Sequence, residues 1–410
     1  MESYISDHFD MWIGGTPSRS NEEFWDGSKI TDNKWVSIRD LKKRFISETE
    51  EYISDLGVRN SNVKLIPKDT VLMSFKLSIG RLAITTSPLY TNEAIVAFVA
   101  KSRKLADDDY LYYGLQSWNL LIEVDQAVKG VTLNKEKMSR IFGLFPPLPE
   151  QKKIASILTS VDEVIETTQK QIDKLQDLKK ATMNELLTKG IGHTEFKDSA
   201  LGRIPKSWEV KRLDEVSLEK GIQTGPFGSQ LHAHEYTTDG VPVVMPKDMK
   251  PPLIDISDIA RIPEHRAIDL SKHRVKKGDI LFSRRGDIGR FALMEASSEG
   301  WVCGTGCLRV RLKNGVVHPY FIAQYLTKDE PKEWLNLNAV GLTMLNLSTS
   351  ILEGLPLIEP SMEEQMTIVS ALQSIDARLS KCRDYLSQTQ SLKKSLMQDL
   401  LTGKVRVEVN

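Results

Sequence analysis

The sequence predicts an α+β protein in which two β-rich domains are separated by two long helices and the two halves of the chain are related by an internal repeat. Three observations support this fold class. The chain has 410 residues, more than one ordinary domain of roughly 100 to 200 residues. The phrase "LKKATMNELLT" at 178–188 returns as "LKKSLMQDLLT" at 392–402. Short β-branched and aromatic runs precede each copy, as in strands.

Composition bounds the class of protein further. Apolar residues make up 40% and charged residues 27%, which is typical of a folded globular protein. The longest apolar run, "AIVAFVA" at 94–100, is far shorter than the ~18 residues of a bilayer crossing, and no signal peptide is visible. We therefore expect a cytoplasmic protein without membrane contact. The three cysteines are too few for a disulfide framework, and no metal site is expected.

The first element is a β-rich domain over residues 1–149. Its runs "TVLMSF", "RLAITT" and "AIVAFV" fall between 70 and 99 and are separated by Gly, Pro, Ser and Asn, which favours strands and turns. The loop "WIGGTPSRSNEEFW" at 12–25 precedes them.

The second element is a long helix over 150–189. It follows "PPLP" at 146–149 and stops at Gly190, which are typical helix boundaries. Its apolar positions are spaced 4, 3, 4, 3, 4, 3, the seam of a helix that packs lengthwise on a partner: Ile154, Leu158, Val161, Ile165, Thr168, Ile172 and Leu175.

A linker at 190–206 and a second β-rich domain at 207–360 follow, and then a second long helix at 361–402 and a tail at 403–410. The second helix repeats the seam at an offset of 214 residues with Ile368, Leu372, Ile375, Leu379, Cys382, Leu386 and Thr389. Each helix of about 40 residues would be roughly 60 Å long. The nearest partner for each seam is the other helix, but packing on its own domain or on another molecule is also open.

The repeat extends weakly into the β-rich domains, whereas the loops differ. "PKDTVLMSFKLSIGRLAI" at 67–84 matches "KKGDILFSRRGDIGRFAL" at 276–293 with a one-residue gap. In contrast, "WIGGTPSRSNEEFW" and "GIQTGPFGSQLHAHEY" (221–236) hold similar places with unrelated side chains. A repeated frame with unlike loops predicts two binding surfaces of different specificity.

Taken together, these motifs resemble the DNA specificity subunits of type I restriction-modification enzymes. The resemblance rests on "GGTPSRSNEEFW", "PPLPEQKKIASIL", "GRIPKSWEVKRL", "GPFGSQL", "VPVVMPKDM", "GDILFSRRGDIGR" and "LLTGKVRV", which span nearly the whole chain. The "PLPEQ" and "GxIPxxWE" patterns are specific only when they occur together.

The resemblance implies a division of labour. Two target-recognition domains each read one half of a bipartite site in double-stranded DNA, and two long antiparallel helices forming a coiled coil hold them apart in a pseudo-twofold arrangement. Two modification subunits dock on the helices and bring S-adenosylmethionine, and restriction subunits with ATP and Mg²⁺ can join them. The specificity subunit binds no cofactor and is not the catalyst.

One segment departs from the pattern. "SWEVKRLDEVSLEKG" (207–221) precedes the second recognition loop, whereas only "MESYISDHFDM" precedes the first. We expect that a lead-in strand is absent or diverged in the first domain, or that "GKVRVEVN" at the C-terminus completes its sheet.

The expected DNA contacts are polar or cationic loop residues, since base edges and phosphates are read by Arg, Lys, Asn, Gln, Ser and Thr. Arg284 and Arg285, beside Gly286 in a basic stretch, are the foremost pair; each other residue alone is equally compatible with an ordinary exposed polar group, and the two aromatic ones with the core. In full they are Thr16, Ser18, Arg19, Trp25, Lys34, Lys76, Arg81, Gln223, Thr224, Phe227, Ser229, Gln230, Lys247, Ser283, Arg284, Arg285 and Arg290. The expected docking residues on the helices are Gln151, Ile154, Leu158, Leu178, Leu186, Gln365, Ile368, Leu372, Leu392 and Leu400.

Two other functions remain open at the level of sequence. A self-contained DNA methyltransferase or nuclease would need a glycine-rich cofactor loop and an "NPPY"-like motif, and neither these nor a Walker loop is present. A coiled-coil scaffold without sequence-specific DNA binding is compatible with the helices alone, and the net charge of zero means that any DNA contact has to be local.

Overall fold

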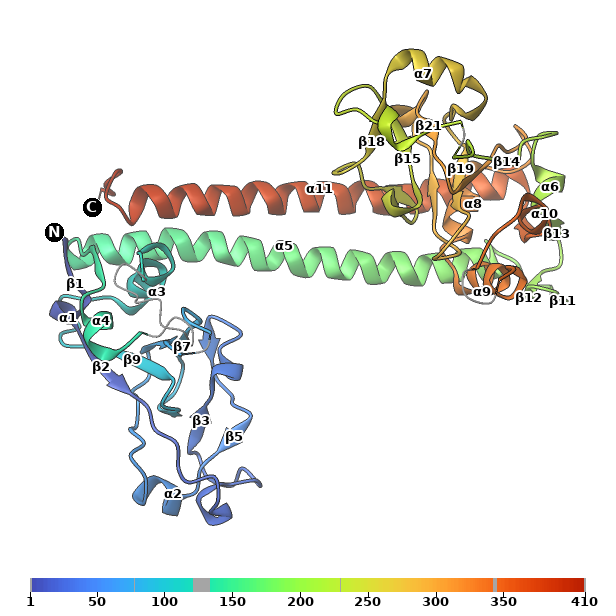
Figure 1. The fold of residues 1–410 in the computed structure, drawn as a ribbon. Coiled ribbons are helices and arrows are strands. Elements are labelled where there is room, and N and C mark those ends of the chain that lie inside the picture. Colours follow the sequence, from blue (N-terminus) through green and yellow to red (C-terminus); the bar gives the residue numbers. More distant parts are fainter. Residues whose placement is uncertain (1, 77, 121–132, 229, 342–344, 409–410) are drawn as a thin grey trace. The chain divides into compact units, whose positions relative to one another are not determined.

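The structure is a computed structural model that describes residues 2–76, 78–120, 133–228, 230–341 and 345–408. The chain divides into two compact units. Unit 1 consists of Met1–Gln171 and Cys382–Asn410, and unit 2 of Ile172–Lys381. The division falls within the two long helices, α5 (Leu148–Lys189) and α11 (Met362–Leu400), so each unit contains part of both (Figure 1).

Unit 1 is built on two sheets. A five-stranded sheet has the order β2(Phe9–Ile13), β9(Ile95–Ala100), β6(Val71–Ser74), β7(Leu82–Thr85), β4(Phe45–Ile46), and a three-stranded sheet the order β5(Glu51–Tyr52), β3(Lys34–Val36), β8(Tyr90–Thr91). The remaining elements are β1(Glu2–Tyr4), α1(Ile5–His8), α2(Asp55–Arg59), α3(Asp108–Ser117), α4(Lys135–Ser139) and β10(Phe142–Leu144). The strands predicted between 70 and 99 are therefore present.

The five-stranded sheet of unit 1 is buried on both faces. Val71 and Phe98 face a core that also includes Ile154 and Leu158 of α5, while Leu72 faces a second apolar cluster. Because successive side chains of a strand point to opposite faces, a sheet buried on both sides reads as a continuous apolar run such as "AIVAFVA".

Unit 2 contains a four-stranded sheet of order β14(Gln223–Thr224), β22(Cys307–Val310), β19(Ile280–Ser283), β20(Phe291–Leu293), and a three-stranded sheet of order β18(Ala260–Ile262), β15(Val241–Val244), β21(Val302–Cys303). Smaller pairs are β11(Phe196–Ser199) with β12(Gly202–Pro205), β13(Glu209–Arg212) with β23(Pro356–Glu359), and β16(Met249–Lys250) with β17(Leu253–Ile254). The helices are α6(Leu213–Val216), α7(Glu264–Asp269), α8(Pro319–Tyr325), α9(Asp329–Asn338) and α10(Thr349–Glu353). The predicted linker at 190–206 thus contains a β-hairpin.

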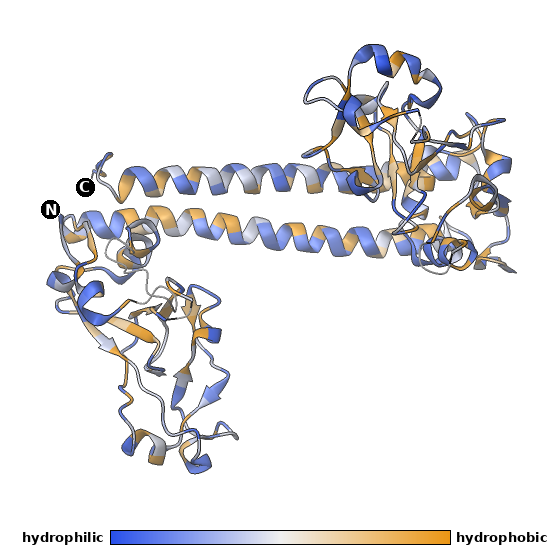
Figure 2. Ribbon diagram, in the orientation of Figure 1, coloured by the Kyte–Doolittle hydropathy of each residue, from blue (hydrophilic) through white to orange (hydrophobic). Residues whose placement is uncertain are grey.

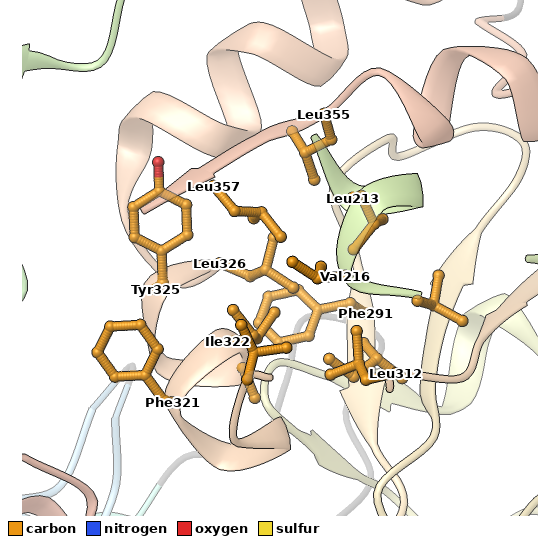
Figure 3. Close-up of a cluster of buried hydrophobic side chains, with 14 of the residues drawn as sticks. Leu213, Val216, Phe291, Leu312, Phe321, Ile322, Tyr325, Leu326, Leu355 and Leu357 are labelled. Atoms are coloured by element: carbon orange, nitrogen blue, oxygen red, sulfur yellow. The ribbon is translucent and has the colours of Figure 1, made fainter. Parts of the chain in front are cut away.

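The largest core of unit 2 lies under α8. Leu213 and Val216 of α6, Ile322 of α8 and Leu357 of β23 gather in one place (Figure 3), and Phe321 of α8 belongs to the same buried cluster. Ile368 and Leu372 of α11 belong to the same cluster and are completely buried. The N-terminal part of α11 is therefore anchored in the domain that precedes it, as the start of α5 is in unit 1.

The structure corrects the expectation about the start of the first domain. A lead-in strand is present: β1 pairs antiparallel with β10, as β13 pairs with β23 in unit 2. The match continues at the next residue, because Ile5 N–H donates to Ile141 O and Leu213 N–H donates to Leu355 O, both at 2.9 Å. Three strand residues, "ESY", carry too little pattern to be recognised.

The described part of the C-terminal tail forms no strand and is held by an ion pair instead. Glu150 in the first turn of α5 accepts hydrogen bonds from Nε and Nη2 of Arg406 at 2.7 and 2.6 Å. The register-matched Glu364 of α11 accepts from Trp208 Nε1 at 2.9 Å and lies 2.8 Å from His193 Nε2. In each unit, the segment that follows one long helix is tied to the glutamate that opens the other.

Both long helices carry the narrow apolar seam that their sequence predicts. The seam residues are all buried or half-buried, including Thr168, Ile172 and Leu379, and Figure 2 shows apolar residues scattered among polar ones along both helices. Gly190 and Gly403 adopt φ of 67° and 74° after the two helices, a backbone conformation that other residues rarely adopt. In the described part of the chain, every helix is too short or too polar to pass through a lipid bilayer.

Candidate nucleic-acid interface

The first recognition loop, residues 14–25, is fixed by close backbone packing. A Cβ at Gly14 would lie 2.2 Å from the carbonyl oxygen of Thr91, so only glycine fits there. Trp35 is buried and donates its indole N–H to Gly15 O at 2.9 Å. The "GG" of this loop therefore places the following residues beside the end of the sheet.

Arg19 and Trp25 form the centre of this loop. The Arg19 guanidinium lies 3.7 Å from the Trp25 ring centroid and pairs with both carboxylate oxygens of Glu51, a hydrogen bond that raises the pKa of Arg19. Trp25 packs edge-on against Trp35, at 5.0 Å between ring centroids. Trp25 thus belongs to a small core, while the Arg19 side chain is about half exposed, at 52%.

The other residues of unit 1 that the sequence predicts as DNA contacts fall into two groups. Thr16 is hydrogen-bonded to Glu93, Ser18 to Ser20 at 2.9 Å, and Lys34 to Ser47 O and Glu48. The Lys34 side chain, at the start of β3, is largely buried, at 16% exposure, and these contacts fix its position. In contrast, Lys76 and Arg81 extend from the turn between β6 and β7 with exposed side chains.

The matching loop of unit 2 presents an aromatic side chain. Gly225 has no room for a Cβ, which would lie 2.1 Å from Gly304 O. Phe227 follows and is 56% exposed, while its backbone N–H is held by Gln230 Oε1 at 3.0 Å. Ser229 lies outside the described residues. An exposed phenylalanine in a fixed loop is suited to contact an apolar or aromatic surface such as a base.

Arg284 and Arg285 follow β19, and their surroundings differ. The backbone of Arg284 is bonded on both sides, to Gly306 O and from Leu347 N–H at 2.8 Å each. Its Nε is buried and has no hydrogen-bond partner in the described part of the chain, whereas Arg285 is exposed. Beyond Gly286, with φ of 79°, Arg290 Nε donates to Asp287 at 2.6 Å and closes the turn.

Two further polar groups lie beside these arginines and were not singled out from the sequence. Thr305 Oγ1 and Asn346 Oδ1 are buried and have no hydrogen-bond partner among the residues that the structure describes. Thr305 precedes the residue that accepts from Arg284, and Asn346 forms an isolated bridge with Arg285. Since buried polar groups are normally satisfied, these three groups around one turn are suited to form hydrogen bonds with a ligand or with water. No sequence motif marks Thr305 or Asn346.

The remaining residues of unit 2 that the sequence predicts as DNA contacts lie in the sheet or are bonded to neighbouring residues. Ser283 is 1% exposed and its hydroxyl donates to Arg285 O at 2.9 Å, so it shapes the turn and cannot reach a ligand. Gln223 donates to Lys220 O at 2.8 Å, and Thr224 lies beside it in β14. Lys247 pairs with Asp258 at 2.7 Å and stays exposed, at 57%.

Most of the expected docking residues on the long helices are buried within the chain. Gln151, Ile154, Leu158, Gln365, Ile368, Leu372 and Leu400 are at most 5% exposed, and Leu186 is half-buried. The two glutamines bond loop backbone, for example Gln151 Nε2 to Pro146 O at 2.8 Å and Gln365 Nε2 to Pro360 O at 2.9 Å. These side chains hold the helices to the β-rich domains and are not available to a partner.

Leu178 and Leu392 have the opposite character. They occupy equivalent positions of the repeat and are 51% and 53% exposed. An exposed leucine at the same place in each copy forms two matching apolar surfaces, one in each unit.

A charged triad near each exposed leucine repeats as well. In unit 1, Asp162 of α5 accepts from Tyr113 at 2.7 Å and pairs with Lys393 of α11 at 2.6 Å. In unit 2, Asp376 of α11 accepts from Tyr320 at 2.5 Å and pairs with Lys179 of α5 at 2.7 Å. Burial, followed by the carboxylate, raises the pKa of Tyr320. Each triad joins a domain helix to both long helices.

The long helices run antiparallel within each unit. In unit 1, position 150 of α5 meets 406 and position 162 meets 393. In unit 2, Lys179 of α5 meets Asp376, and His193, just beyond that helix, meets Glu364.

Comparison with known proteins places these features in context. A model of the type I restriction modification DNA specificity domain matches residues 2–177 and 205–384. The chain is 31% identical over 394 residues to the putative type I restriction enzyme MjaX specificity subunit of Methanocaldococcus jannaschii, covering 93% of this chain and 85% of that protein. It is 28% identical over 376 residues to the MjaVIII specificity subunit of the same organism, covering 87% and 85%.

Solved structures share the fold. The S subunit of the type I restriction-modification system from M. genitalium superposes with a TM-score of 0.60 at 14% identity, covering 98% of this chain and 96% of that chain. A chain from a study of complex assembly and conformational transition of the type I R-M system gives a TM-score of 0.57 at 14% identity, covering 99% and 98%.

Proposed function

The chain belongs to the family of type I restriction-modification DNA specificity subunits, and from this premise we propose that it directs a DNA modification complex to a bipartite site in double-stranded DNA. Unit 1 reads one half of the site and unit 2 reads the other. The chain supplies recognition and geometry, while the methyl transfer takes place on its partners.

One observation carries this proposal. The two units repeat the same frame, with β1 and β10 matching β13 and β23, but they present different side chains at equivalent loops. Unit 1 offers Arg19 over Trp25, and unit 2 offers Phe227 and the turn at Arg284. A frame that is kept twice while its loops diverge is suited to two different half-sites.

The residues proposed to contact DNA are either exposed or belong to the turn around Arg284. In unit 1 they are Arg19, Lys76 and Arg81. In unit 2 they are Phe227 with Arg284 and Arg285, and Thr305 and Asn346 supply polar groups beside these arginines. Exposed cations bind phosphates, and fixed polar groups next to them read base edges.

The proposed partners are two modification subunits, one on each surface around Leu178 and Leu392. Two equivalent surfaces fit two copies of one partner. S-adenosylmethionine would be bound by these subunits, and ATP and Mg²⁺ by restriction subunits if they join. Such a complex would act in the cytoplasm, where it meets the DNA.

A domain exchange tests the division of labour. Replacing residues 2–146 with the corresponding domain of a relative should change one half of the methylated motif and leave the other half unchanged. The reciprocal exchange of residues 209–360 should change only the other half. Methylation-aware sequencing reads both motifs, and a change in both halves after either exchange would refute the two-unit proposal.

The alternative of a self-contained methyltransferase is separated by a simpler measurement. The purified chain, incubated alone with DNA and labelled S-adenosylmethionine, should transfer no methyl group, and activity should appear when modification subunits are added. Methyl transfer by the chain alone would favour the alternative. A pure scaffold would show no sequence-selective DNA binding even with the modification subunits present.

A further inference from the structure

A basic groove on unit 2 is not explained by the surfaces described above. Two neighbouring cavities of about 470 and 450 Å³ share Lys276, Glu299 and Arg311 as lining residues. Seven lysine or arginine side chains line them against two carboxylates. A chain without net charge therefore concentrates positive charge here.

Arg309 is the buried centre of this groove. It lies in β22, is 6% exposed and lines the larger cavity. Its Nη1 donates to Lys272 O at 2.8 Å and to Arg274 O at 3.2 Å, and its Nη2 donates to Gln223 Oε1 at 2.8 Å. Its Nε has no hydrogen-bond partner among the described residues. The guanidinium is thus held in one position by three hydrogen bonds, and its Nε–H and one N–H of Nη2 are unused.

The nearest carboxylate is already occupied. Asp279 Oδ1 accepts from Arg311 Nε at 2.8 Å, and Oδ2 accepts from Arg311 Nη2 at 2.7 Å and from the Lys276 backbone N–H at 2.8 Å. Arg309 Nε lies 4.0 Å from Oδ2, too far for a hydrogen bond. Asp279 is thus a distant ion-pair partner of Arg309 that is shared with Arg311, so the buried charge of Arg309 is only partly compensated and favours an added anion.

The repeat shows that the frame does not require this arginine. In unit 2, Arg309 pairs with Leu281 of β19 and Gln223 of β14. At the same places in unit 1, Ala97 pairs with Leu72 and Trp12.

Ala97 and Trp12 belong to an apolar cluster, so the same sheet position holds a hydrophobic core in unit 1 and a guanidinium in unit 2. The difference shows that the strand frame itself does not need a guanidinium at this position, so Arg309 has a role particular to unit 2: it holds the carbonyls of Lys272 and Arg274 and adds positive charge to the groove.

We propose that this groove binds a phosphate group, with Arg309 as the fixed donor and Lys272 and Lys276 as exposed partners. Several donors converging from separate segments suit an anion with three or four oxygens, and neither lysine forms a salt bridge in the described part of the chain. The phosphate comes either from the DNA backbone or from a free phosphate compound. The first source rests on the proposed function, and the second does not.

Titration of the full-length chain with inorganic phosphate, against chloride at equal ionic strength, tests the binding itself. Arg309→Gln and the double variant Lys272→Ala/Lys276→Ala should each weaken phosphate binding roughly ten-fold or more, the loss of a charged hydrogen bond. The exposed pair Lys197→Ala/Lys206→Ala removes the same charge outside the groove and should change nothing. Because Lys272 and Lys276 are exposed, that double variant keeps the test valid if Arg309→Gln does not fold.

DNA binding by the chain with its modification subunits identifies the source. If the phosphate is that of the DNA backbone, the lysine variant lowers the slope of log affinity against log salt by about one per lost contact, and inorganic phosphate competes with DNA. If variants lose inorganic phosphate but bind DNA with an unchanged slope, the groove takes a free phosphate compound.

Folded variants that match the wild type in both titrations would overturn the proposal. Sequence-selective methylation by the wild-type complex would in that case still support the proposed function, so the two failures can be told apart.

Discussion

Arg284 and Arg285 are adjacent in the chain, but their side chains have different freedom. The backbone of Arg284 is bonded to Gly306 and Leu347, and its Nε is buried, whereas Arg285 is exposed. An arginine held by its surroundings loses little entropy when it bonds to a base, while an exposed one is suited to a phosphate. The pair therefore combines base discrimination by Arg284 with phosphate binding by Arg285.

Alanine substitutions at these two positions should give different results. Arg284→Ala should reduce discrimination between the cognate base and a wrong one by about 1 to 3 kcal/mol. Arg285→Ala should weaken binding to all sequences and reduce the salt slope by about one. Binding of the assembled complex to cognate and altered duplexes at several salt concentrations measures both, with Lys197→Ala as the control. Unchanged affinity and slope in both variants would remove these arginines from the interface.

Some of these roles could be anticipated from the sequence and others could not. Two arginines before a glycine indicate an exposed turn, and Gly286 has the positive φ of such a turn. The burial of Ser283 and the bonding of Lys34 to Ser47 O depend on where strands pair. The burial of Thr305 Oγ1 and Asn346 Oδ1 also depends on tertiary contacts, so no local pattern marks these residues.

At the level of elements, the long helices follow the predicted bounds closely. They were expected over 150–189 and 361–402 and are found at Leu148–Lys189 and Met362–Leu400, because prolines and glycines mark their ends. The sequence does not indicate which side of each helix is covered. Most of the expected docking residues pack on the domains, and these include the residues with which each seam begins, Ile154 and Leu158 in α5 and Ile368 and Leu372 in α11.

Leu178 and Leu392 should control the number of bound modification subunits. Replacing either leucine by aspartate should remove one of two subunits, and replacing both should remove both. The reason is that burying a charge at the centre of an apolar contact has a large desolvation cost. Native mass spectrometry of the assembled complex counts the subunits. Leu337→Asp, at an 85% exposed leucine of α9, is the matched control. Full occupancy in the double variant would place the docking surface elsewhere.

The whole molecule divides differently from the domain scheme expected from the sequence. The scheme treats each helix as a separate piece, whereas the compact units divide within the helices near residues 171 and 381. Ile154 and Leu158 of α5 are part of the unit 1 core, and Ile368 and Leu372 of α11 are part of the unit 2 core. Periodicity shows that a helix has an apolar face, but tertiary contacts decide to which core it belongs.

The helix segments between the two triads should set the gap between half-sites. Four residues inserted after Gln171 and four after Lys381 lengthen both helices by about 6 Å and keep the apolar face nearly aligned. The gap in the methylated motif should grow by one base pair, at most two, at a rise of ~3.4 Å each, while both half-sites stay the same.

Two residues inserted at the same places rotate the following face by roughly 200° and should abolish assembly. A four-residue variant that methylates with an unchanged gap would show that the helices do not set the spacing.

The reciprocal ion pairs have a consequence for the ancestry of the chain. Asp162 and Lys179 lie in the first half, and Asp376 and Lys393 occupy the equivalent positions of the second. A chain of half this length would carry both the aspartate and the lysine. In a homodimer of two such chains, the aspartate of each copy would pair with the lysine of the other. We infer that the present chain arose when the gene of such a homodimer was duplicated and fused. Residues 1–206 expressed alone should therefore self-associate in light scattering, Lys179→Asp should give monomers, and Lys179→Asp with Asp162→Lys should restore the dimer. A half-chain that stays monomeric would contradict an origin from a homodimer.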